Sequence, residues 1–263
     1  MLSYCGELVR KHDPDRFFMS LMQPADRREA LWALYAFNYE IAKTREVVTD
    51  TTLGLIRLQW WRDGIAEIYD GKDVRQNEIL PTLAQAIKDY DLPQKLFEDL
   101  CYAREFDLEG VIPADMAGLL NYAAFTAVPL NELALKILGQ SEDEALEVVS
   151  QSYALVGLVK ALPFHASQQR CYMPADLLAA QEIPERAAYE FKAQEALQPV
   201  LKAVVLHAEA LLKGRNPSSK WLKLHRKAAL MACKQLRSCD YDVFSNKAID
   251  KPAFFHLRLF LTF

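Results

Sequence analysis

Apolar side chains recur three and four residues apart along almost the whole chain, and runs that alternate in the manner of a strand are hard to find. This pattern predicts an all-α protein. The first long helix is expected to open at 24–26, to end near Val48 and to bury one stripe of Leu31, Leu34, Asn38, Ile41 and Ala42. A second helix, capped by Thr51 or Thr52 and ending near residue 70, is expected to carry Leu55, Leu58, Trp61, Ile65 and Ile68.

Proline and glycine divide the rest of the chain into further helices near 80–90, 94–108, 113–138, 142–162, 185–213 and 217–239. Pro163 is expected to end the helix before it, so that 164–173 leave the bundle as a loop. The apolar run 254–263 is expected to pack on the bundle, with a docking surface for a partner or a bilayer as the alternative. Short connections favour antiparallel neighbours, and we expect one domain over 1–263.

Composition excludes several classes of protein. An apolar share of 51%, a charged share of 25% and a mean hydropathy of −0.07 are typical of a folded globular chain. The net charge of −4 offers no long-range attraction to nucleic acid. No stretch approaches the roughly 18 apolar residues of a membrane span, and the N-terminus lacks the apolar core of a secretory signal. A cytoplasmic location is therefore expected.

Five cysteines without paired spacing favour reduced, structurally idle thiols over a disulfide framework or a zinc site. The histidines are scattered, and His165 stands without a Cys, Asp or second His at ligand spacing. We therefore expect His165 to be a structural loop histidine rather than a metal ligand or general base.

Four short segments carry a resemblance to a known family, and together they are specific. They are 15–18 (Asp-Arg-Phe-Phe), 28–37 (Arg-Glu-Ala-Leu-Trp-Ala-Leu-Tyr-Ala-Phe), 58–63 (Leu-Gln-Trp-Trp-Arg-Asp) and 172–176 (Tyr-Met-Pro-Ala-Asp). The chain resembles the squalene/phytoene synthase family from Tyr4 through Asp176, and more weakly beyond. The resemblance implies an isoprenoid-synthase bundle of helices around a central cavity, where two D-x-x-x-D motifs hold Mg²⁺ against a prenyl diphosphate.

The aspartates of both motifs are largely absent from this sequence. The family pattern places Ala42 and Glu46 at the first motif, and Ala161 and His165 at the second. Mg²⁺ needs hard oxygen ligands in near-octahedral geometry, and one carboxylate at these four positions supplies too few. The resemblance therefore implies a chain without the family's catalysis, without catalytic residues at these positions and without a metal or other cofactor.

Two lysines stand beside the lost aspartates, Lys43 in the first motif and Lys160 in the second. They would form a metal-free anion pocket for a phosphate or a lipid headgroup, because lysine binds phosphate as a point charge. The resemblance adds Tyr35, Asn38 and Arg170 as further ligand-binding residues. The alternative is that both lysines face solvent or pair with Glu40, Glu46 or another acid.

Aromatic and basic runs admit a plain interpretation beside a functional one. Trp60–Trp61 and Phe17–Phe18 are expected to be core rather than the lining of a prenyl tunnel. The run 220–227 is basic and partly apolar, as in helices that lie on anionic membranes, yet a solvated face over a packed one is expected.

A narrower branch of the family fits better. Segments 38–42, 162–166 and 242–244 resemble the bacterial counterparts of mitochondrial complex I assembly factor 6. This resemblance implies a non-catalytic role in the assembly of respiratory NADH dehydrogenase. The implied partner is a complex I subunit or assembly intermediate, with a prenyl or lipid ligand in the cavity and contact with the inner face of the cytoplasmic membrane.

Two other functions stay open at this point. One is an active prenyltransferase that condenses isoprenyl diphosphates with Mg²⁺, recruiting Glu46, Asp107 and Asp176 as substitute ligands. The other is a carrier that only sequesters prenyl lipids.

Overall fold

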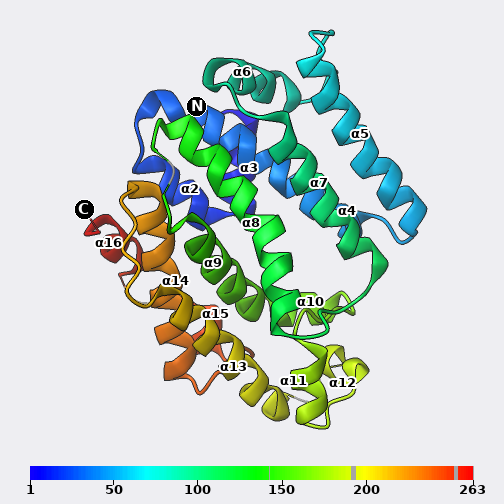
Figure 1. Cartoon of the computed structure of the whole chain (residues 1–263), viewed down its shortest axis with the longest axis vertical. Coiled ribbons are helices and arrows are strands. Elements are labelled where there is room, and N and C mark those ends of the chain that lie inside the picture. The colour runs from blue at the N-terminus through cyan, green and yellow to red at the C-terminus, as the bar shows by residue number, and fades with distance from the viewer. Residues whose placement is uncertain (142, 191–193, 252–253, 263) are drawn as a thin grey trace. The chain divides into compact units, whose positions relative to one another are not determined.

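The computed structural model describes residues 1–141, 143–190, 194–251 and 254–262, and every regular element in these ranges is a helix (Figure 1). The all-α prediction is confirmed. The N-terminal elements are α1 (Tyr4–His12), α2 (Pro14–Leu21), η1 (Ala25–Arg27), α3 (Arg28–Ala42), α4 (Thr44–Val47), α5 (Thr51–Tyr69), α6 (Leu80–Tyr90) and α7 (Gln94–Glu109). They are followed by α8 (Met116–Leu138), α9 (Leu146–Lys160), α10 (Leu162–Ser167), α11 (Ala175–Ala180), α12 (Glu185–Tyr189), α13 (Gln194–Leu212), α14 (Lys220–Ser238), α15 (Asn246–Ile249) and α16 (Phe255–Phe260).

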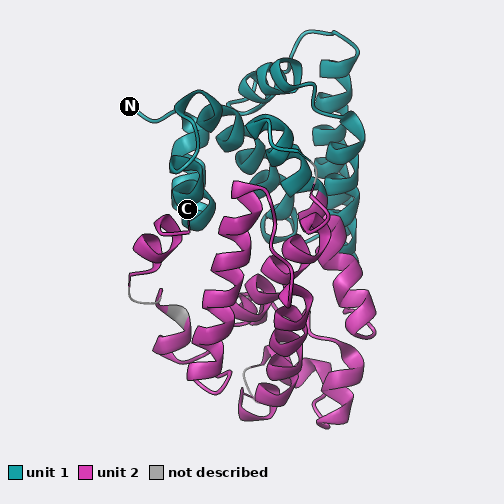
Figure 2. Cartoon of the chain, turned by 60° about the vertical axis from the view of Figure 1, so that its left-hand side comes forward, with its two compact units in different colours: residues 1–109, 129–142 teal, residues 110–128, 143–263 magenta. Residues whose placement is uncertain are grey.

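The chain groups into two compact units, which Figure 2 shows in different colours. Unit 1 consists of Met1–Glu109 and Pro129–Glu142, and unit 2 consists of Gly110–Val128 and Asp143–Phe263. Helix α8 supplies residues to both units, with Pro129 inside it at the division. A single domain over 1–263 remains a prediction, and the two units are described one at a time.

Unit 1 is built on α3, which packs against α1, α6 and α7. Residues 30–37 of this helix are all buried, because neighbours cover it on every side. The Phe37 ring meets Trp61 of α5 and Phe97 of α7 edge-on, with ring centroids 5.6 Å apart in both pairs. Three helices are thereby joined through one aromatic side chain.

The predicted bounds of the first two helices needed correction. The first helix ends at Ala42 and not near Val48, since the Lys43 backbone has ψ −2° and the chain restarts as α4. The second helix is capped by Asp50, whose carboxylate accepts from the Leu53 N–H, and not by Thr51 or Thr52. Gly54 of this helix allows close packing on α7, since a Cβ there would lie 2.5 Å from Leu108 Cδ2.

Unit 2 is built on α9, which packs against α13 and α14. The Ser152 hydroxyl donates to the carbonyl of Ala208 at 2.9 Å, and the buried His225 ring contacts Tyr153 and Trp221, each with centroids 4.7 Å apart. The basic run 220–227 thus covers a packed face, as expected: Trp221, Leu222, Leu224 and His225 are buried.

Asp143 fixes the start of α14 in unit 2. Its carboxylate accepts from the N–H groups of Ser218, Ser219 and Ala145 and from the Ser218 hydroxyl, over 2.6 to 3.1 Å. Burial would raise the pKa of Asp143, but these four hydrogen bonds hold it below the ordinary value. Asp143 therefore joins the approach to α9 to the N-terminus of α14.

The C-terminal third departs from the predicted pair of long helices. The first of them divides into α12 and α13, with residues 191–193 outside the described ranges. The run 254–263 is only half packed: Phe255 and Leu259 are buried, whereas Phe254, Leu257, Phe260 and Leu261 are exposed, and residue 263 lies outside the described ranges.

Four of the five cysteines are buried and all are free thiols. Burial raises the pKa of Cys5, Cys101 and Cys233 to about 12 and that of Cys171 to about 11. In the described part of the chain, no helix combines the length and hydropathy needed to cross a bilayer.

Candidate functional site

The positions of the first degenerate motif lie at the junction of α3 and α4 in unit 1. Ala42 is the last residue of α3, Lys43 is the residue between the helices, and Glu46 lies exposed on α4. Positions 42 and 46 therefore belong to two helices instead of one continuous helix face. Of the four motif positions, only 46 carries a carboxylate here.

Glu40, two residues before the motif, is the electrostatic centre of this segment. It is buried, and its two carboxylate oxygens pair with Lys43 at 2.5 Å and Arg57 at 2.7 Å. Lys43 and Arg57 therefore share one largely desolvated carboxylate. The alternative in which Lys43 pairs with Glu40 is therefore the one observed, whereas Arg57, 17 residues away, was missed.

Two aromatic rings extend this cluster. The Lys43 ammonium lies 4.8 Å from the Tyr39 ring centroid. The His12 ring stacks on the same Tyr39 ring, with the two centroids 4.2 Å apart. Burial lowers the pKa of the His12 imidazole, Lys11 and Lys43 lower it further, and Glu40 opposes them. Burial likewise raises the pKa of Tyr39, with Glu46 and Glu40 adding to the increase.

Tyr35 and Asn38 lie on α3 before this cluster. Tyr35 is buried, with the Arg16 guanidinium 5.4 Å from its ring centroid, and Arg16 is itself paired with Asp13 at 2.7 Å. The Oδ1 atom of Asn38 is buried and accepts no hydrogen bond from the described residues. A buried acceptor of this kind is ready to receive an N–H or O–H from a bound molecule.

The second degenerate motif lies at the junction of α9 and α10 in unit 2. Helix α9 ends at Lys160, Ala161 stands between the helices, and His165 belongs to α10. The helix before Pro163 ends at Lys160, but the prediction of a loop over 164–173 was wrong for 164–167, which belong to α10. Pro163 occupies the first turn of α10, where its missing N–H costs nothing.

Lys160 has a neutral partner. Its ammonium donates to Oε1 of the buried Gln235 at 3.1 Å. The Gln235 amide nitrogen donates in turn to the backbone carbonyl of Lys247 at 2.7 Å and to that of Asp250. Sequence reasoning missed Gln235, which lies 75 residues from Lys160 and carries no motif.

His165 is held by aromatic contacts. Its ring meets Tyr172 at 4.8 Å and Phe164 at 5.7 Å, and Tyr172 stacks on Tyr122 at 5.2 Å. The Arg170 backbone N–H closes the segment on the His165 carbonyl at 3.0 Å, and the Nε atom of Arg170 is buried without a hydrogen-bond partner among the described residues. Arg170 and His165 of unit 2 are therefore joined by a backbone hydrogen bond at the C-terminal end of α10.

The substitute ligands of the prenyltransferase alternative are spread over the two units. Asp107 of α7 is buried and ion-paired with Arg104 at 3.3 Å, whereas Asp176 lies exposed in the first turn of α11. Within the described ranges, no three His, Cys, Asp or Glu side chains are grouped so as to hold a metal ion. The residues at the motif positions do not fit the Mg²⁺ cluster that the family implies.

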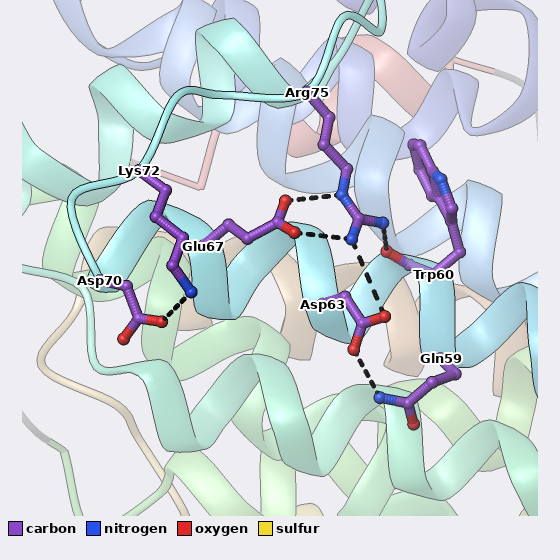
Figure 3. A network of polar contacts seen from close by, with 7 residues as sticks. All are labelled: Gln59, Trp60, Asp63, Glu67, Asp70, Lys72 and Arg75. Carbon is purple, nitrogen blue, oxygen red and sulfur yellow. Dashed lines mark hydrogen bonds and ion pairs between the residues drawn. The ribbon is translucent and has the colours of Figure 1, made fainter.

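The segment 58–63 has a structural role in unit 1, which Figure 3 shows from close by. Arg75, from the loop after α5, binds the Glu67 carboxylate through two nitrogens at 2.6 and 2.8 Å and donates to the Trp60 carbonyl at 2.9 Å. Asp63 lies 3.8 Å from the same guanidinium and accepts from Gln59 at 2.7 Å. This network fastens the loop to α5.

The whole chain is similar to proteins of one known family. The family model of squalene/phytoene synthase matches residues 9–238. The human NADH dehydrogenase (ubiquinone) complex I, assembly factor 6 is 26% identical over 268 residues, covering 98% of this chain and 80% of the human protein. A phytoene synthase of Thermus thermophilus is also 26% identical, covering 88% of this chain and 78% of that enzyme.

The fold has a close counterpart among solved structures. A dehydrosqualene synthase solved with a ligand has a TM-score of 0.76 at 14% identity, over 98% of this chain and 94% of that chain. At this identity the likeness shows the fold alone, and it confirms the predicted isoprenoid-synthase bundle.

Proposed function

Because this chain belongs to the squalene/phytoene synthase family, we propose that it uses the family's fold for binding in the assembly of respiratory complex I, without prenyl transfer. The partner is a complex I subunit or an assembly intermediate. Relatives named as complex I assembly factors support this function, since similarity to the human protein covers 98% of the chain.

One observation carries the loss of prenyl transfer. Glu40, the carboxylate two residues before the first motif, already pairs with both Lys43 and Arg57. A divalent metal there would meet two positive charges and a carboxylate whose oxygens are occupied. Diphosphate departure in this family depends on the metal, so the arrangement favours a binding protein over an enzyme.

A lipid or prenyl group is the ligand that we propose for this fold. The buried Asn38 Oδ1 of unit 1, which accepts no hydrogen bond from the described residues, is a polar atom available to such a ligand. Binding to the folded state alone would stabilise the protein. We further propose that the protein works in the cytoplasm at the inner face of the cytoplasmic membrane, where its client is assembled.

Gene deletion in the source organism tests the assembly role. We expect less assembled complex I on native gels and lower NADH-dependent quinone reduction in isolated membranes, with unchanged isoprenoid content. Re-expression of the natural chain should restore both. Normal complex I together with altered isoprenoids would overturn the proposal and favour a lipid carrier or an enzyme.

Incubation with farnesyl diphosphate and Mg²⁺ tests the absence of prenyl transfer. We expect pyrophosphate release no faster than in a protein-free mixture. A variant with Glu46→Gln serves as the matched control, because Glu46 is the one carboxylate left at the motif positions. Turnover by the natural chain that falls in this variant would establish the prenyltransferase alternative.

A further inference from the structure

Charge is distributed unevenly along the chain, and the C-terminal part is strongly basic. Residues 219–263 contain nine lysines and arginines but three aspartates and no glutamate, although the whole chain has a net charge of −4. Such asymmetry indicates a surface for an anionic partner. The relevant elements, α14, α15 and α16, all lie in unit 2.

Helix α14 presents a row of lysines along one face. Lys220, Lys223, Lys227 and Lys234 are spaced by three, four and seven residues, which places them on one side of the helix. Lys220 and Lys234 are exposed, and the other two are partly exposed. The opposite side of the helix is buried in unit 2.

The row leads into a groove of about 410 Å³ at the C-terminal end of α14. Four basic side chains line this groove, together with Met231, Gln235, Ser238 and a single acidic residue, Asp250; the four are Lys234, Lys247, Lys251 and Arg258. The buried Gln235 donates to the Lys247 and Asp250 carbonyls, and this pair of hydrogen bonds fixes α15 against α14. The basic groove is therefore held in shape by buried polar contacts.

Exposed apolar side chains adjoin the groove on α16. Phe255 and Leu259 anchor this helix, with the Lys251 ammonium 5.4 Å from the Phe255 ring centroid. Four large apolar residues around them face solvent, with exposed fractions between 52% and 72%: Phe254, Leu257, Phe260 and Leu261. Basic residues next to exposed Phe and Leu are typical of segments that lie in a membrane interface.

We propose that the groove and the exposed side of α16 bind the surface of an anionic phospholipid bilayer. The four basic side chains of the groove contact lipid phosphates, and Phe254, Leu257, Phe260 and Leu261 enter the boundary between headgroups and acyl chains. This inference rests on the proposed function at the cytoplasmic membrane and identifies the surface of the protein that contacts the lipid. Apolar side chains of this size gain nothing from a nucleic acid backbone, which is why a bilayer is the occupant.

Vesicle sedimentation with the purified full chain tests this surface. We expect the protein to bind vesicles in which a third of the lipid is phosphatidylglycerol and to stay in solution with pure phosphatidylcholine. The double substitution Lys234→Gln with Lys251→Gln should weaken vesicle binding about 25-fold, because each basic residue lost lowers the affinity about fivefold. Replacing Leu257→Asn and Phe260→Asn should weaken it by a similar or larger factor.

A matched control lies on α13 of the same unit. Lys202 and Leu206 are both exposed, so Lys202→Gln with Leu206→Asn removes one charge and one apolar side chain outside the groove and should leave binding unchanged. Thermal unfolding of every variant verifies that it is folded. Equal binding to both vesicle types, or equal loss in the control, would overturn the inference.

The outcome is independent of the deletion experiment. If deletion impairs complex I while the natural chain ignores anionic vesicles, the assembly role stands and this surface is not a bilayer site. If the Leu257→Asn and Phe260→Asn variant then fails to restore complex I although it is folded, the surface is a protein docking site and the inference is wrong.

Discussion

The two degenerate motif segments have lost their aspartates in different ways. At the end of α3, charge is retained, since the Glu40 carboxylate pairs with both Lys43 and Arg57. At the end of α9, charge is largely replaced by packing: His165 contacts aromatic rings, and Lys160 donates to the Gln235 amide. One segment is therefore sensitive to single charge changes, and the other is sensitive to the loss of side-chain shape.

The largest effect is expected from Glu40→Gln. Removing the carboxylate leaves Lys43 and Arg57 facing each other, with only 21% and 32% of their side chains exposed. We expect the free energy of unfolding to fall by about 2 kcal/mol, below the full cost of a broken buried pair because both cations reach solvent. Urea denaturation measures it.

The control for this change is Glu7→Gln, which removes an exposed ion pair with Arg10 on α1. It should cost less than about 0.5 kcal/mol. Equal losses in both variants would show that burial of Glu40 does not matter.

His165→Ala should come next. It removes the ring contacts with Tyr172 and Phe164, and we expect a loss of about 1 kcal/mol in unfolding free energy. His256→Ala is the matched control, since that exposed ring meets Phe255 at a similar 5.5 Å. A loss no larger than that of the control would contradict the packing interpretation.

A smaller effect is expected from Lys160→Met, which keeps the length of the side chain. Gln235 loses one donor but keeps its two backbone acceptors, so we expect a cost of about 0.5 kcal/mol, measured by urea denaturation. A cost above that of Glu40→Gln would mean that the second segment also depends on charge.

The smallest effect is a shift in a titration. Lys43→Met removes a charge that lowers the pKa of His12, so that pKa should rise in an NMR titration of the His12 ring, whereas Glu40→Gln should lower it. Since folding lowers this pKa, the unfolded chain binds more protons. The stability that His12 contributes is present above the unfolded pKa of about 6.5 and is lost as the pH falls from there through the lower pKa of the folded chain. A pKa of His12 that moves in the same direction in both variants would contradict these charge contributions.

The fold could be predicted from the sequence because its signals are local. Helical spacing of apolar residues identified most elements, and Thr51 and Thr52 were proposed as caps one and two positions from the true cap, Asp50. The break at Lys43 could not be predicted, since no glycine or proline marks it. The helix that begins beside Pro163 was not predicted, because a proline is found both after the end of a helix and in the first turn of the next one.

The partners within the candidate site depend on distant contacts. Lys43–Glu40 is a local pair at helical spacing, and the sequence named it as an alternative. Arg57 and Gln235 reach their partners only through the packing of α5 near α3 and of α14 against α9, which no spacing in the sequence specifies. The ligand-binding roles of Tyr35, Asn38, Arg170, Lys43 and Lys160 stay predictions.

The interruption of α3 at Lys43 also bears on whether a metal site could be built at the first motif. Aspartates placed at 42 and 46 would stand on α3 and α4, two separate helices, whereas 161 and 165 both follow α9 and lie one turn apart at the start of α10, where the His165 N–H donates to the Ala161 carbonyl at 2.9 Å. Two aspartates at the first motif would thus lack a common helix face. A magnesium site engineered there would need the break at Lys43 closed as well as the carboxylates added.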